Sequence, residues 1–172
     1  NHIGPDDIAI KPLLERIARL GILVQYQPVF LESDIDIAES RVGKDLASTS
    51  YAFRTAVEYG VPVSFGTDSP IEDCNPFGCI FHAVTRQDRG GKHAEPFFLA
   101  ECVDVETAVD AYTIGSAYCQ RMEAFKGRIR EGYLADLVVL DRDIFTVPAE
   151  AIKDILPVMT MIGGEVVFER TI

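Results

Sequence analysis

The amino-acid sequence predicts an α/β fold, in which helices alternate with parallel strands and a small unit of antiparallel strands follows. The first indication is the rhythm of the chain, since helix-like segments precede two short apolar runs, residues 22–27 and 61–65, about forty residues apart. That order is typical of parallel strands joined by crossover helices. The second indication is Gly163-Gly164, which separates two strand-like segments and favours a tight hairpin. We expect the two units to cover residues 1–122 and 123–172.

The first helix is predicted from apolar residues at helical spacing, namely Ile10, Leu13, Leu14, Ile17 and Ala18. Acidic residues Asp6 and Asp7 stand at its positive N-terminal end, and Gly21 stands where a helix commonly stops. Residues 22–27 follow as a strand rich in strand-forming side chains, and Pro28 ends this strand.

A polar segment, residues 32–43, leads to a second predicted helix, residues 46–59. The apolar residues 61–65 then form a strand of the buried parallel type. Two further helices are predicted, one over residues 76–87 and one that begins at Asp104, a favourable N-cap. The strands of the terminal unit are predicted at residues 135–141, 158–162 and 165–168.

The composition bounds the classes of function. The chain has 172 residues, of which 48% are hydrophobic and 25% charged, as in ordinary globular domains. Its 27 acidic and 16 basic residues give a net charge of −11, which repels phosphate backbones and anionic membranes. We therefore expect no nucleic-acid and no membrane partner, although an acid excess also serves solubility alone.

No apolar run approaches the roughly 20 residues that cross a bilayer and no signal peptide is visible, which favours a cytoplasmic location. The four cysteines form no CxxC pair, so we expect free, mostly buried thiols.

Asp68 is the strongest candidate for catalysis. It follows a strand of the buried parallel type, at the end where closed α/β barrels carry their active sites. A carboxylate there can bind a divalent cation and also accept a proton from metal-bound water. From the residues alone, the alternative is an aspartate that caps the following loop or helix.

The other candidates are one glutamine and three histidines. His2 precedes a helix in a position suited to a metal ligand, although a surface histidine has the same pattern. Gln27 points to the same face of its strand as Gln25, and it could hydrogen-bond a substrate or satisfy backbone groups at the rim. His82 lies in a predicted helix, which favours packing. His93 lies in a loop rich in glycine and lysine, either solvated or part of a lid.

Six stretches of the chain carry a resemblance to a known family, in the family's own order. They are residues 63–70 (VSFGTDSP), Asn75-Pro76, 83–87 (AVTRQ), 111–118 (AYTIGSAY), 126–141 (KGRIREGYLADLVVLD) and 160–167 (TMIGGEVV). Together they resemble the amidohydrolase superfamily, in particular the branch called amidohydrolase family 3. The combination of the first stretch with the fifth is specific to this branch.

The resemblance implies the C-terminal part of a TIM (β/α)8 barrel, its sixth through eighth strands, followed by the C-terminal strands of a small composite β-sandwich. It implies that Asp68 contacts a divalent metal, with zinc as the expected ion, and activates the hydrolytic water. His2 matches a metal-ligating histidine of the sixth strand, although Asn1 stands where the family has glutamate. Gln27-Pro28 matches a Gln-Pro pair near the substrate. The family's other metal ligands would precede residue 1.

The function implied is hydrolysis of carbon–nitrogen (non-peptide amide-type) bonds in a small-molecule substrate by a metal-activated water. A catalytic zinc usually keeps three protein ligands, so we expect this C-terminal fragment to be inactive alone. A barrel without its other strands has open edges, so we expect either a homo-oligomer or association with the missing N-terminal part of the same chain. The alternative is a non-catalytic α/β binding or assembly fragment.

Overall fold

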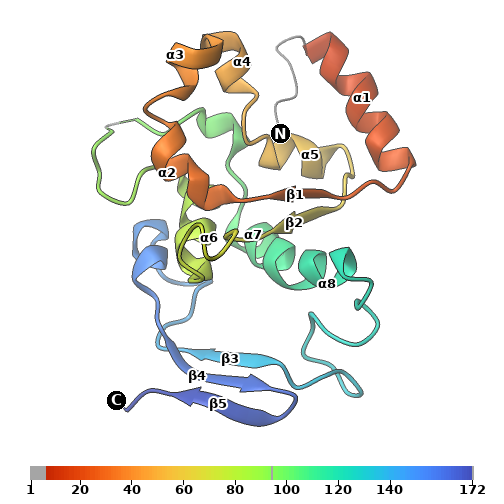
Figure 1. The fold of residues 1–172 in the computed structure, drawn as a ribbon, viewed down its shortest axis with the longest axis vertical. Helices are drawn as coiled ribbons and strands as arrows, with labels where there is room; N and C mark the ends of the chain where they lie inside the picture. Colours follow the sequence, from red (N-terminus) through yellow and green to blue (C-terminus); the bar gives the residue numbers. More distant parts are fainter. Residues whose placement is uncertain (1–6, 94, 172) are drawn as a thin grey trace.

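The computed structural model describes residues 7–93 and 95–171 and has a mixed α/β fold (Figure 1). In chain order its first elements are α1 (Asp7–Arg19), β1 (Val24–Tyr26), the 3-10 helix η1 (Pro28–Phe30), α2 (Leu31–Asp34), α3 (Ala38–Val42), α4 (Lys44–Ser48), α5 (Phe53–Glu58), β2 (Val63–Phe65) and α6 (Pro76–Thr85). Next come η2 (Leu99–Glu101), α7 (Val105–Asp110), the π-helical turn η3 (Ala111–Gly115), α8 (Ser116–Cys119), β3 (Leu137–Leu140), the 3-10 helix η4 (Ala149–Asp154), β4 (Pro157–Ile162) and β5 (Glu165–Glu169).

The two predicted strands of the first unit pair with each other as parallel neighbours. Val24 lies opposite Val63 and Tyr26 lies opposite Phe65, so β1 and β2 run in register with their carboxyl ends together. The helices α1, α5 and α6 lie around this pair (Figure 1). The predicted order of helix, strand, helix and strand is therefore confirmed, with strands shorter than the apolar runs that predicted them.

The second predicted helix, residues 46–59, is wrong as a single element, because the structure divides it into α4 and α5. Tyr51 interrupts the helix with a left-handed backbone, φ 56°. The backbone carbonyls of Ser50 and Tyr51 turn toward Arg86 and accept hydrogen bonds of 3.2 and 2.8 Å from its guanidinium group. The polar segment at residues 32–43 also contains the short helices α2 and α3.

Aromatic rings form the centre of the core. The Phe53 ring meets the rings of Tyr26 and Phe65 edge to face, with centroid distances of 5.1 and 5.2 Å. All three side chains are buried, and together they join α5 to the parallel strands. Asp104 caps α7 as predicted, since its carboxylate accepts a hydrogen bond of 2.7 Å from the Thr107 amide.

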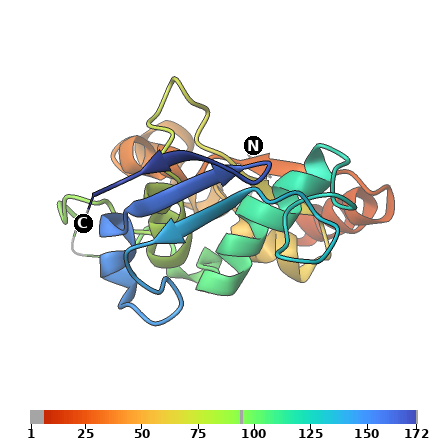
Figure 2. The same cartoon turned by 90° about the horizontal axis from the view of Figure 1, so that it is seen from below.

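The terminal unit is an antiparallel sheet of order β3-β4-β5. Gly163 and Gly164 connect its last two strands with positive φ values of 57° and 87°, which confirms the predicted hairpin. The sheet lies across the front of the helices in the view from below (Figure 2). The 3-10 helix η4, which the sequence did not predict, packs against α6 and buries Ile152 and Ile155.

All four cysteines are free, as expected, but only Cys79 is buried. Cys74 and Cys119 are exposed, because one lies in the loop before α6 and the other ends α8, so the expectation of mostly buried thiols is wrong. Among the described helices, none has the length and apolar character needed to span a membrane.

Candidate functional site

The carboxyl ends of β1 and β2 bring two of the predicted site residues to one edge of the parallel pair. The Gly66 amide donates a hydrogen bond of 3.0 Å to the Tyr26 carbonyl, which extends the ladder by one step. Gln27 follows Tyr26 directly, and Asp68 comes two residues after Gly66. Active sites of closed α/β barrels lie at this edge, so the placement is the one that the sequence predicted.

A tight turn fixes the backbone of Asp68. Its φ is 60°, in the left-handed region that aspartate tolerates better than most residues. The Ile71 amide donates 2.9 Å to the Asp68 carbonyl, and the Ser69 amide donates 3.3 Å to the Thr67 hydroxyl. The loop that begins with this turn stands out from the body of the molecule (Figure 2). A carboxylate is thus presented on a backbone held from both sides.

The Asp68 side chain is exposed, and its carboxylate makes no hydrogen bond or ion pair with any described residue. Other residues perform the capping that was the alternative role. Asn75 caps α6 by accepting 2.9 Å from the Phe77 amide, and Asp73 accepts 3.0 Å from the Asn75 amide. Within the described part of the chain, Asp68 is therefore neither a helix cap nor a loop cap.

Gln27 is half-buried, and the predicted alternation along β1 is confirmed because Gln25 is exposed while Tyr26 is 1% exposed. Burial, together with the nearby Glu101, raises the pKa of Tyr26 to about 12, so the face of β1 that carries Tyr26 stays neutral. The Gln27 carbonyl accepts 3.1 Å from the Phe30 amide, whereas its side-chain amide makes no hydrogen bond with any described residue. The side chain is thus available for a ligand.

The three histidines occupy different kinds of position in the chain. His2 lies outside the described residues. His82 is fully buried in α6, which confirms the packing prediction; its Nδ1 lies 2.8 Å from the Gln87 carbonyl. Its Nε2 lies 3.2 Å from Glu32 at an angle poor for a hydrogen bond, and burial lowers the pKa of the imidazole. His93 is held between the carboxylates of Asp88 and Asp36, at 2.9 and 3.0 Å.

The described residues hold no cluster of three or more His, Cys, Asp or Glu side chains arranged to bind a metal ion. Asp68 nevertheless suits a divalent cation, because its carboxylate is exposed and has no protein partner in the described part of the chain. The described residues thus offer such an ion one ligand at this edge.

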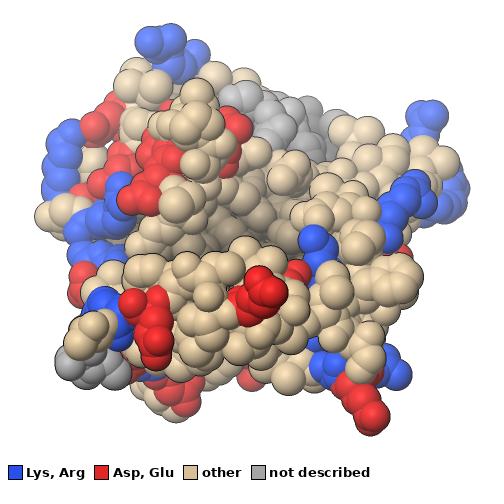
Figure 3. All heavy atoms as spheres, turned by 60° about the horizontal axis from the view of Figure 1, so that its bottom comes forward, with Lys and Arg blue, Asp and Glu red and all other residues tan. Residues whose placement is uncertain are grey.

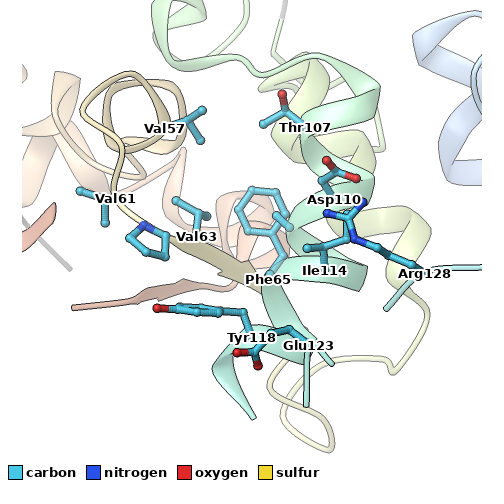
Figure 4. Close-up of a pocket in the computed structure, with 13 residues that line it drawn as sticks. Val57, Val61, Val63, Phe65, Thr107, Asp110, Ile114, Tyr118, Glu123 and Arg128 are labelled. Carbon is cyan, nitrogen blue, oxygen red and sulfur yellow. The ribbon is translucent and has the colours of Figure 1, made fainter. Parts of the chain in front are cut away.

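A cavity of about 600 Å³ lies beside β2, but its lining does not include Asp68 or Gln27. The cavity is walled by Val61, Pro62 and Val63 at the start of the strand and by residues of α5, η3 and α8 (Figure 4). Most of the side chains around it are apolar. Since active sites of barrels lie at the opposite strand ends, we do not assign catalysis to this cavity.

Sequence reasoning missed the residues that hold Asp68 in place. The dipeptide Ser69-Pro70 is a turn signal that could have located the turn. The contact from the Cys79 thiol to the Gly66 carbonyl, 3.6 Å, had no signal in the sequence, because the two residues meet only in the folded chain.

Comparisons with known proteins show the family of the chain. The model of the amidohydrolase family matches residues 6–168. The chain is 35% identical over 159 residues to YtcJ, a Bacillus subtilis protein named as an amidohydrolase, covering 92% of this chain and 30% of YtcJ. It is 30% identical over 121 residues to the N-substituted formamide deformylase of Arthrobacter pascens, covering 70% of this chain and 22% of that enzyme. The chain thus spans less than a third of the length of these relatives.

Solved structures give the same result. An uncharacterised metal-dependent hydrolase from Pyrococcus furiosus matches with 34% identity and a TM-score of 0.65, covering 78% of this chain and 26% of that one. One from Pyrococcus horikoshii matches with 30% identity and a TM-score of 0.69, covering 80% and 28%. The mixed α/β fold, with its parallel pair, fits part of a TIM-barrel-type fold. The chain belongs to the amidohydrolase family, in the branch called family 3.

Proposed function

We propose that this chain is the C-terminal part of a metal-dependent hydrolase that cleaves carbon–nitrogen bonds of the non-peptide amide type. The observation that carries the proposal is the Asp68 carboxylate, which is exposed and unpartnered among the described residues at the carboxyl end of β2. Membership of the amidohydrolase family and the likeness to metal-dependent hydrolases support this reading.

Asp68 and His2 are the residues that would hold a divalent metal, for which we propose zinc. When bound, such an ion lowers the pKa of water to near 7 and so supplies a nucleophile at neutral pH. Asp68 takes the proton that this water loses and later returns it to the leaving nitrogen. The side-chain amide of Gln27, on the neighbouring strand end, hydrogen-bonds and orients the substrate.

The substrate is a small molecule with an amide-type or amidine-type carbon. N-substituted formamides are the first class to test, because a relative at 30% identity is named as an N-substituted formamide deformylase. N-acyl amino acids, cyclic amides and heterocycles that undergo deamination form the rest of the panel. Specificity in barrel enzymes resides largely in loops, so the fold alone does not select among these classes.

We propose that the chain needs further strands from the N-terminal part of the same polypeptide or, failing that, from a second copy. In the described part, β1 and β2 pair only with each other, although parallel sheets are ordinarily buried on both faces. The cavity beside β2 leaves room for a neighbouring element (Figure 4). Because the described residues offer a metal one ligand, we also expect the chain by itself to be inactive.

The terminal sheet supports the same proposal. Its apolar side chains Val138, Val166 and Phe168 are between 45% and 53% exposed. Figure 3, in which the bottom of the molecule is turned forward, shows a largely tan face that carries a few acidic side chains. We propose that further strands cover this sheet to complete a composite β-sandwich. In this proposal residues 1–122 form the barrel unit and residues 123–172 form the sandwich unit.

We also propose that the protein is located in the cytoplasm.

The test uses the full-length protein that contains this chain. Elemental analysis should find stoichiometric divalent metal, and Asp68→Asn should lower kcat on the amide panel by at least about 1,000-fold, as loss of a catalytic group does. Glu72→Gln is the matched control, because it removes one negative charge from the same loop without touching the turn. Retention of normal turnover in the Asp68→Asn protein would refute the proposal.

An assembly or binding role without catalysis is the second candidate, and the exposed sheet favours it. In that case the full-length protein would lack tightly bound metal, and Asp68→Asn would weaken ligand binding without removing any turnover. Sedimentation of the isolated chain tests the proposed association. We expect the isolated chain to form oligomers or aggregates. A monodisperse monomer with no exposed apolar patch contradicts it.

A further inference from the structure

We propose that Cys79 is a positioning residue for the site described above. Its buried thiol joins the carboxyl ends of β1 and β2 and thereby sets where Gln27 and Asp68 stand relative to each other. The inference rests on the proposed function, since it matters only if these two residues act on one substrate.

The first contact holds the end of β2. Cys79 lies in α6 with 0% of its surface exposed, and its Sγ donates a hydrogen bond of 3.6 Å to the Gly66 carbonyl. Gly66 is the last residue in register with β1 and stands two positions before Asp68. The thiol therefore binds the backbone at the point where the strand becomes the catalytic turn.

The second contact holds the end of β1. The helix α6 packs against η1, the segment that follows Gln27 directly. Val29 in η1 is buried, and its backbone lies near enough to the Cys79 thiol to lower the pKa of that thiol, against the larger effect of burial. Val29 stands two positions after Gln27, so the thiol lies between the backbone that follows one site residue and the backbone that precedes the other.

Tyr112 is the third residue beside the Cys79 thiol. Its hydroxyl is buried and has no hydrogen-bond partner of standard geometry among the described residues. It interacts with the Cys79 sulfur, and burial followed by this interaction raises the pKa of Tyr112. The Tyr112 ring also meets the Phe65 ring edge to face, with centroids 6.2 Å apart. The residue before Gly66 is thus packed against the same group.

The protonation state suits a donor. Burial raises the pKa of the Cys79 thiol, and the interactions with Tyr112 and Val29 oppose this only in part. The group therefore remains a thiol at neutral pH, and a thiol can both donate and accept weak hydrogen bonds. The strand β2 has only three residues, and its carboxyl end is also held by the Ser116 hydroxyl, which donates 3.2 Å to the Phe65 carbonyl. The thiol adds a hydrogen bond one residue further along, at Gly66.

The test compares Cys79→Val, which has a similar volume but no donor, with Cys79→Ser, which keeps one. Both are made in the full-length, metal-loaded protein, and Cys102→Ala is the control for loss of a half-buried thiol. Cys79→Val should lower kcat about 10- to 100-fold with KM within about 2-fold, because a misplacement near 1 Å has effects of this order. Cys79→Ser should recover most of kcat. If the valine variant does not fold, Cys79→Ala takes its place.

A second readout does not depend on turnover. Amide hydrogen exchange over residues 66–71 should speed up about 5-fold or more in Cys79→Val and return toward wild type in Cys79→Ser. If Cys79→Val matches Cys102→Ala in kcat and exchange, or if serine is as poor as valine, Cys79 is only a core residue and the inference is wrong. Failure of the proposed function would appear separately, as undiminished turnover in Asp68→Asn, while the exchange rates would still decide the role of Cys79.

Discussion

Replacing Arg86 by methionine should destabilise the fold, because Arg86 is a fully buried cation that holds three backbone carbonyls. Its Nε donates 2.7 Å to the Phe97 carbonyl, and its terminal nitrogens donate 2.8 and 3.2 Å to the carbonyls of Tyr51 and Ser50. The guanidinium carbon also lies 5.3 Å from the centroid of the Phe53 ring. One side chain thereby ties the break between α4 and α5 to the segment before η2.

The magnitude follows from two opposing effects. Three carbonyl oxygens would lose their charged donor, at about 2 kcal/mol each, or roughly 6 kcal/mol together. Burial lowers the pKa of Arg86 from 12.5 to about 10, so keeping the cation inside costs about 3 kcal/mol, which methionine would regain. The difference predicts that Arg86→Met lowers the free energy of unfolding by about 3 kcal/mol. Methionine retains most of the apolar stem of the arginine side chain. It must adopt the same left-handed backbone as arginine at this position, φ 58°, so the backbone conformation is common to both proteins.

Urea unfolding followed by circular dichroism measures the effect. Arg54→Met is the matched control, because Arg54 pairs with Glu58 at 2.7 Å while both side chains are more than half exposed. Such an exposed pair one helical turn apart contributes little to the free energy of unfolding, because water screens the two charges. Equal destabilisation by the two substitutions would refute the argument that burial and the three carbonyls make Arg86 important.

Three further perturbations follow from the structure. Although burial acts in the opposite direction, backbone amides and the His93 ring hold the pKa of Asp88 below its usual range. The ionised carboxylate therefore stabilises the folded state above about pH 4, and this contribution to the free energy of unfolding is lost as the pH falls. Asp88→Asn should therefore cost about 1–2 kcal/mol at pH 7 and flatten the acid side of a stability–pH profile; an unchanged profile contradicts this. Asp104→Ala removes the cap that binds the Thr107 amide and should lower the free energy of unfolding by about 0.5–2 kcal/mol, whereas Asp104→Asn should cost much less. Phe53→Ala should cost about 3–5 kcal/mol in the same assay, and a loss below about 1 kcal/mol would show that the aromatic core is not central.

Local patterns identified most of the secondary structure because they report local physics. Helical spacing located α1, the Asp104 cap located the start of α7, and the glycine pair at 163–164 located the last hairpin. The division between α4 and α5 escaped prediction, since it depends on a guanidinium group that arrives from Arg86, 35 residues away from Tyr51. The sequence window around Tyr51 contains no trace of that partner.

For the candidate site, the sequence by itself singled out the residues that we propose to carry the chemistry. The order of strand, turn and acid singled out Asp68, and strand periodicity singled out Gln27, because both signals lie within a few consecutive residues. Only the tertiary structure decided that these residues share one edge, that the Asp68 carboxylate is unpartnered among the described residues, and that the Cys79 thiol reaches Gly66. Those outcomes depend on strand register and on helix packing across long separations in the chain, which no short-range pattern of side chains encodes.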